Sequence, residues 1–358
     1  DEPKDYKFLL SLFGISKNLS HNWCDILELI ENNEDSIDFS NKLIKRDEGA
    51  AMGNGQKLYK RAKESIPGGN MLLSKRPEMF LPDLWPSYFD SASGIEVKDL
   101  DGNSYIDMCI MGIGTNSLGY GDIDVDKAVS KTISKGNMST LNCPEEVHLI
   151  ERLISMHPWA GMGKLTRSGG EANSVALRIA RAYSGKSKVA ICGYHGWHDW
   201  YLSANLSSKD GLKEHLLPGL STKGVPGSLE GDTIPFFYND IKSLEKIFTQ
   251  NDDVGVIFME VQRNDKPHDR FLEKVQELAL ENKAVLIFDE CTSGFRECFG
   301  GLHLKYNVEP DLAMFGKALG NGYAINAVIG RKEIMQAAQD TFISSTFWTE
   351  RVGPSAAL

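Results

Sequence analysis

Residues of reactive types follow several short apolar segments of this sequence. Tyr194 and His195 come after KVAIC, Glu260 after VGVIFM, Asp289 after AVLIF, and Lys317 one glycine after DLAMF. An amine, two carboxylates, an imidazole and a phenol can together perform nucleophilic and acid–base catalysis. A single lysine or carboxylate in a loop is weak evidence, since most such groups are simply solvated. Their recurrence where apolar segments end predicts that they share one site.

A glycine-rich stretch, Ser168-Gly169-Gly170, precedes a segment with helical periodicity. The apolar positions of one face are Ala172, Val175, Ala176, Ile179, Ala180 and Tyr183. We predict a helix whose first amides are not screened by side chains, and such an N-terminus suits a phosphate. An ordinary glycine turn into a helix fits these residues equally well. The Gly-Lys-Ser/Thr of a Walker loop and the Rossmann glycine spacing are both missing.

A phosphate site, a lysine and a buried carboxylate together are what pyridoxal 5'-phosphate requires of a protein. Lys317 would hold the cofactor as a Schiff base, the internal aldimine, and would then carry a proton between carbons as general acid and base. Asp289 would keep the pyridine nitrogen protonated. The ring of Tyr194 would stack on the face of the cofactor. These three residues are the predicted catalytic set.

The elements that must position this set read as an α/β fold. Segments 188–192, 254–259, 284–288 and 311–315 are short, apolar and separated by helical stretches of crossover length. That pattern predicts a mostly parallel sheet with helices on both faces. Such sheets bind ligands at the carboxyl ends of their strands.

The length of 358 residues exceeds the size at which a single hydrophobic core stops growing, so we expect a large domain and a smaller α+β domain. The acidic, helical residues 1–54 read as an extension or the remnant of an upstream domain. Residues 55–110, with a hairpin turn at Asp101-Gly102, read as the first part of the small domain. We assign 111–345 to the large cofactor-binding domain and 346–358 to the start of the return to the small domain, which is then incomplete.

Composition restricts the partners and the compartment. The formal net charge of −10 argues against nucleic acid, and no apolar run approaches the roughly 20 residues of a membrane span. Six cysteines without a Cys-x-x-Cys pair fit a reducing compartment, so we expect the cytoplasm. His195 and His198 are too few for a zinc site, and we expect no metal.

Five strings resemble the motifs of the class III aminotransferases, fold type I pyridoxal-phosphate enzymes, and especially the branch of glutamate-1-semialdehyde aminomutase. They are SGGEANSVALRIARAYSG, YHGWHD, LIFDECTSGFR, FGKALGNG and SSTFWTERVGP, within a match from about Gln56 to Leu358. The resemblance implies the roles given above for Lys317, Asp289 and Tyr194. It also implies that Thr346 reaches the phosphate of a neighbouring subunit, and hence a homodimer with its active site at the interface.

Several weaker candidates stand beside these residues in the sequence. His195 would support the cofactor loop, and Glu260 would orient the site from its strand end. Asn264, with Arg263, would contact the cofactor's phenolic oxygen or the substrate, although surface hydrogen bonding is as good an explanation. Ser168 would join Gly169 and Gly170 at the phosphate.

Three departures from the family pattern stand out. Gly170 replaces the Ser or Thr that usually follows the first glycine, at a cost on the order of 1 kcal/mol for one hydrogen bond. The Ser-Pro-Val-Arg of the aminomutases is absent, so either Arg76 takes over its arginine's role or the substrate differs. The family continues well beyond the point where this chain stops, at Leu358.

The activity expected is amino-group transfer from a small-molecule donor to a carbonyl acceptor. Intramolecular transfer of the aminomutase type is the alternative, and the sequence does not separate the two. A non-catalytic scaffold that uses residues 1–54 as an interaction arm is less favoured, because the lysine and aspartate are retained. A nucleotide-dependent enzyme, with Asp289-Glu290 as a metal pair and 168–171 as phosphate loop, is the third hypothesis.

Overall fold

The computed structural model describes residues 52–208, 211–212 and 220–358. The predicted acidic, helical extension at residues 1–54 therefore lies outside the described residues, apart from positions 52–54. No helix of the described part is both long and apolar enough to cross a membrane.

A seven-stranded sheet forms the centre of the structure, in the order β4-β10-β9-β8-β7-β5-β6. Its strands are β4 (Met162–Thr166), β5 (Lys188–Cys192), β6 (Thr233–Pro235), β7 (Val254–Glu260), β8 (Val285–Glu290), β9 (Leu312–Phe315) and β10 (Asn326–Gly330). β10 is antiparallel to both of its neighbours, and all other pairs are parallel. The predicted α/β fold with a mostly parallel sheet is confirmed.

The four predicted strands correspond to β5, β7, β8 and β9, with bounds that differ by no more than two residues. Each is completely buried apart from the first residue of β5, which explains why each reads as a continuous apolar run. β4, β6 and β10 were not predicted. β4 carries Lys164 and two glycine or threonine positions, and a half-exposed edge strand of that kind lacks the apolar run.

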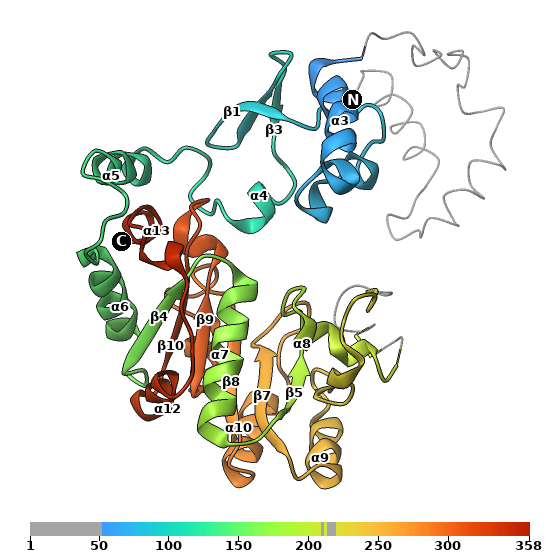
Figure 1. Cartoon of the computed structure of the whole chain (residues 1–358), viewed down its shortest axis with the longest axis vertical. Coiled ribbons are helices and arrows are strands. Elements are labelled where there is room, and N and C mark those ends of the chain that lie inside the picture. Colours follow the sequence, from blue (N-terminus) through green and yellow to red (C-terminus); the bar gives the residue numbers. More distant parts are fainter. Residues whose placement is uncertain (1–51, 209–210, 213–219) are drawn as a thin grey trace, which may run out of the picture.

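Helices cover both faces of this sheet (Figure 1). The helices described from residue 120 onward are α5 (Ile123–Ile133), α6 (Pro144–Met156), α7 (Gly169–Ser184), α8 (Asp199–Leu202), α9 (Ile241–Gln250), α10 (Phe271–Glu281), α11 (Leu302–Tyr306), α12 (Lys332–Gln336) and α13 (Val352–Ala357). Of these, α5 packs on α13 and not on the sheet. α7 and α12 share one core with the sheet, and α9 and α10 share another. The predicted apolar face of α7 is buried except at Tyr183, which is 50% exposed because it lies in the last turn.

A three-stranded antiparallel sheet lies apart from the large one, beside α3 (Asn54–Ser65). Its strands are β1 (Phe89–Ser93), β2 (Glu96–Asp99) and β3 (Ser104–Ile106). The β2–β3 turn is the predicted hairpin, and Gly102 in it has φ 85°, a conformation that favours glycine. The short helix α4 (Met111–Gly114) lies between the two sheets in Figure 1. The domain boundaries at residues 110 and 345 stay predictions.

The alternation of side chains along β8 decides what its last two residues face. Val285 and Ile287 pack into the core shared with α7, whereas Phe288 packs into the core shared with α10. Because successive residues of a strand point to opposite faces, Asp289 continues the α7 side and Glu290 the α10 side.

Candidate active site

Lys317 opens the 3₁₀ turn η7 (Lys317–Gly320) directly after β9 and one glycine. Its backbone has φ 44°, an uncommon conformation for a residue with a side chain and one often found at functional sites. The amine, Nζ, donates a hydrogen bond to Thr292 Oγ1 at 3.0 Å. Burial lowers the pKa of Lys317 below its ordinary value, so more of this amine is uncharged and nucleophilic than in an exposed lysine.

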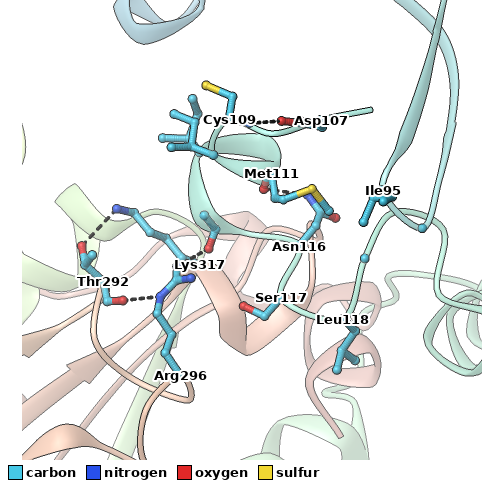
Figure 2. A pocket seen from close by; sticks show the side chains of 15 residues that line it. Ile95, Asp107, Cys109, Met111, Asn116, Ser117, Leu118, Thr292, Arg296 and Lys317 are labelled. Carbon is cyan, nitrogen blue, oxygen red and sulfur yellow. Dashed lines mark hydrogen bonds between the residues drawn. The ribbon is translucent and has the colours of Figure 1, made fainter. Parts of the chain in front are cut away.

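Lys317 lines a cavity of about 830 Å³ that opens towards the small sheet. Figure 2 shows Lys317, Thr292 and Arg296 on one side of this cavity, facing the segment that carries Cys109 and Met111. The guanidinium of Arg296 donates to the backbone carbonyls of Thr292 and Gly114. The lining holds two basic side chains, Arg296 and Lys317, and one acidic side chain, Asp107. The guanidinium of Arg296 suits an anionic group of a small molecule, and the Lys317 amine suits a carbonyl group.

Asp289 lies at the end of β8, only 4% exposed. Its Oδ2 accepts from His195 Nδ1 at 2.9 Å and from Asn173 Nδ2 at 3.1 Å, while Oδ1 accepts from the amide of Cys291 at 3.0 Å. Burial by itself would raise the pKa of this carboxyl, but the hydrogen bond and charge of His195 outweigh it and the pKa is lowered. Asp289 is thus a buried carboxylate that stays ionised.

Glu260 ends β7 and is the register partner of Asp289 on the neighbouring strand. It accepts from the amide of Tyr194 at 3.0 Å and pairs with Arg263 at 2.8 Å. Burial and the charge of Asp289 raise the pKa of Glu260. Glu260 therefore fixes the backbone at Tyr194, which agrees with the orienting role predicted for it. Asn264 is exposed and lines a smaller cavity of about 190 Å³ beside Glu260 and Arg263.

The N-terminus of α7 is organised by a capping box. Ser168 Oγ accepts from the amide of Glu171, and the Glu171 carboxylate accepts from the amide of Ser168 at 3.0 Å. The Ser168 hydroxyl is thus engaged with the helix. In the described structure the amides of Gly169 and Gly170 have no acceptor, and the space beside Gly169 is open to 3.7 Å, where Cys291 Sγ lies. The two glycine amides are the free donors of this turn.

Two predicted positions lie away from this group. Thr346 begins the turn η9 (Thr346–Thr349), is exposed, and makes no hydrogen bond to Lys317 or Asp289 within the described part of the chain. Arg76 donates to the Leu73 carbonyl and does not line the cavity of Lys317. Lys317 and Asp289 therefore lie close to each other in the structure, whereas Thr346 lies on the surface.

Sequence reasoning missed four side chains that complete the site. Asn173 contacts Asp289, Thr292 contacts Lys317, and Arg296 lines the cavity. Cys291 is a buried thiol whose pKa is raised by burial, and it accepts from Asn326 Nδ2 at 3.5 Å. Three of the four follow Asp289 within seven residues, so closeness to that carboxylate was the available signal. Among the described residues, no three His, Cys, Asp or Glu side chains lie close enough together to hold a metal ion.

Comparison with known proteins agrees with this arrangement. A sequence model described as "Aminotransferase class-III" matches residues 84–358. The chain is 37% identical to a 3-aminobutyryl-CoA aminotransferase of Cloacimonas acidaminovorans, over 86% of this chain and 72% of that one. It is 36% identical to a glutamate-1-semialdehyde 2,1-aminomutase of Methanothrix thermoacetophila, over 80% of this chain and 65% of that one. The chain therefore spans 65–72% of the length of these relatives.

A solved structure with a similar fold is the FumI protein of Sphingopyxis sp. MTA144, described as its PLP internal aldimine form. The TM-score is 0.73 at 27% identity, covering 85% of this chain and 71% of that one. The two chains therefore share a fold.

Proposed function

Because the chain belongs to the class-III aminotransferase family, we propose that it binds pyridoxal phosphate at Lys317 and transfers an amino group from a donor to a carbonyl acceptor. One observation carries the proposal: Asp289 lies at the end of β8 and Lys317 follows the adjacent parallel strand β9. The carboxylate is buried and kept ionised by His195, and the amine is partly buried with a lowered pKa.

The residues present fit this cofactor. The free amides of Gly169 and Gly170 at a 16-residue helix suit its phosphate. Asp289 offers a buried anion for the pyridinium nitrogen, and Tyr194 offers an aromatic face. Bound pyridoxal phosphate supplies an aldehyde for amines and a ring that accepts the electron pair left when a substrate carbon loses its proton.

The protein's own groups would then bind, orient and move protons. Lys317 Nζ would accept the proton of the substrate carbon and return it, since its pKa is lowered by burial. Thr292 would orient this amine through the 3.0 Å hydrogen bond. Arg296, which lines the same cavity, would hold the anionic end of a substrate; Arg76, the candidate from the sequence, does not line this cavity.

Absorbance and mass mapping test the proposal. Purified protein incubated with pyridoxal phosphate should absorb in the visible range, and borohydride should fix the cofactor to one peptide that contains Lys317. The Lys317→Ala variant should remain unlabelled. Attachment at another lysine, or no uptake of the cofactor by folded protein, would overturn it.

We favour transfer between two molecules over the aminomutase alternative, because the relative of higher identity bears an aminotransferase name. The distinction can be measured with one amino substrate at a time. An aminotransferase should convert its donor only when a carbonyl acceptor is added. An isomerised product formed without an acceptor would instead support the aminomutase.

We also propose a homodimer with its active site at the interface. Met108, Leu118 and Phe347 are each at least 67% exposed, a costly arrangement for large apolar side chains in a monomer. Thr346 adjoins Phe347 and is itself exposed, as a residue serving the partner's site would be before assembly. The cytoplasm stays a prediction from the cysteine pattern.

Mixing two inactive variants tests this assembly. Subunits with Lys317→Ala should regain activity when dissociated and reassembled with subunits that carry Thr346→Ala, because one site of each mixed dimer is then intact. Sedimentation should give twice the chain mass. A monomer at micromolar concentration, or mixing without any gain, would contradict the dimer.

A further inference from the structure

Gly170, in the first turn of α7, lies directly against the imidazole of His198. A Cβ atom added to Gly170 would lie 2.8 Å from His198 Nε2 and 3.1 Å from its Cδ2. Packed side chains do not approach so closely. The imidazole of His198 therefore occupies the space that a side chain at position 170 would need.

The His198 ring is held from its other edge. Its Nδ1 lies 2.5 Å from Ser174 Oγ, and the indole of Trp200 donates to the same oxygen at 3.2 Å. An indole N–H can only donate, so the Ser174 oxygen accepts there and its own hydrogen is available to His198 Nδ1. This chain of hydrogen bonds favours the tautomer that carries its hydrogen on Nε2. Burial lowers the pKa of His198, which agrees with a neutral ring.

We infer that His198 is a phosphate-binding residue of the cofactor site, with Nε2 as a hydrogen-bond donor beside the first turn of α7. The inference rests on the proposed function, in which the cofactor's phosphate binds there. Gly170 stands where the resembling family has Ser or Thr, and the Nε2 atom of His198 lies next to the position that such a side chain would occupy. The imidazole thus replaces the hydroxyl that this chain lacks.

Binding of two related probes to the apoprotein separates this role from a structural one. Pyridoxal has the ring and aldehyde of pyridoxal phosphate but lacks the phosphate. His198→Ala should raise the dissociation constant of pyridoxal phosphate roughly 10- to 100-fold, as expected for one hydrogen bond to a charged group. The dissociation constant of pyridoxal, measured by quenching of tryptophan fluorescence, should not change.

A second substitution provides the rescue. Gly170→Ser alone should weaken binding of pyridoxal phosphate, because the new side chain displaces His198. The double variant Gly170→Ser with His198→Ala should recover most of the affinity, since a hydroxyl then has both room and reach. If His198→Ala folds poorly, His198→Phe removes the donor while it keeps the ring and carries the same expectation.

The matched control is His268→Ala, which removes an imidazole that is 61% exposed, and it should bind both probes like the wild type. Equal loss of affinity for both probes in His198→Ala, or full affinity of Gly170→Ser alone, would overturn the inference. If the wild type binds pyridoxal phosphate and His198→Ala binds it equally well, this inference alone is contradicted. Failure of the wild type to bind pyridoxal phosphate would contradict the proposed function itself.

Discussion

Asp289 and Glu290 are neighbours in the chain, and each is a buried carboxylate paired with a histidine, yet they belong to different regions of the molecule. Asp289 faces the α7 side, where it contacts His195 and Asn173. Glu290 faces the opposite side and is completely buried. It accepts from the side chains of His303 and Ser293 and from the amides at 302 and 303.

The two regions differ in what the pair adjoins. Glu290 and His303 lie among Trp159, Phe288 and His157, and neither of them lines the cavity of about 830 Å³ or that of about 190 Å³. Asp289 influences the pKa of Lys317, whose amine lines the large cavity. A buried carboxylate–histidine pair is therefore not in itself a sign of catalysis, and the reactive group next to it decides its role.

The largest effect is expected for a substitution in the region of Asp289 and Lys317. Lys317→Ala should lower turnover by more than about 10⁴-fold, because covalent attachment and the general acid–base are lost together. The melting temperature should stay near that of the wild type. Turnover assays and thermal melts check this, with exposed Lys332→Ala as control. Substantial turnover by Lys317→Ala would break the comparison.

Glu290→Gln should act on stability instead. Removing one partner of a buried pair costs about 3–5 kcal/mol, here because an amide would face donors from His303 and Leu302. Denaturant unfolding of the apoprotein measures this loss. Turnover per folded molecule should be unchanged. A selective loss of turnover without loss of stability would mean that Glu290 serves the site.

Asp289→Asn should reduce turnover roughly 10²- to 10³-fold, the usual cost of removing one preorganised electrostatic group. Its effect on stability should be smaller than that of Glu290→Gln. Asp289→Glu, which keeps the charge, is the matched control and should retain more activity. Equal turnover of Asp289→Asn and wild type at saturating cofactor would contradict the role of this carboxylate.

The loss of stability in acid should differ between the wild type and Glu290→Gln. The pKa values of Asp289 and Glu290 lie below their ordinary values of 3.8 and 4.5, because His195 and His303 outweigh burial. A lowered pKa stabilises the fold above the ordinary value, and this stability is lost as pH falls towards the lowered one. Each unit is worth about 1.4 kcal/mol. Between about pH 5 and pH 3, Glu290→Gln should therefore lose less stability than the wild type, as followed by urea unfolding.

The smallest effect concerns the hydrogen bond at the lysine. Thr292→Val should cost about 1 kcal/mol, hence a several-fold loss of kcat, because the Lys317 amine loses its acceptor. Thr292→Ser keeps the hydroxyl and should remain close to wild type. Identical kcat values for Val and Ser variants would show that this contact does not orient Lys317.

Much of the fold was predictable because the inner strands are buried on both faces. β7 and β8 contain uninterrupted apolar runs, and Glu260 and Asp289 directly follow these runs at the ends of the strands. β10 was missed for a physical reason: its first residue is asparagine and its last is glycine, so only three apolar residues stand in a row. A single antiparallel strand also breaks the regular strand–helix order on which the prediction relied.

The sequence by itself determined that Lys317, Asp289, Glu260 and Tyr194 lie at one edge of a mostly parallel sheet. The apolar runs indicate buried strands, and the helical stretches of crossover length between them indicate the parallel direction. Only the tertiary structure decided their partners. His195 reaches Asp289 across 94 positions, and Arg296 reaches the loop at Gly114 across 182. Such contacts depend on how segments far apart in the sequence pack together, and the local periodicity of one segment does not specify its partner.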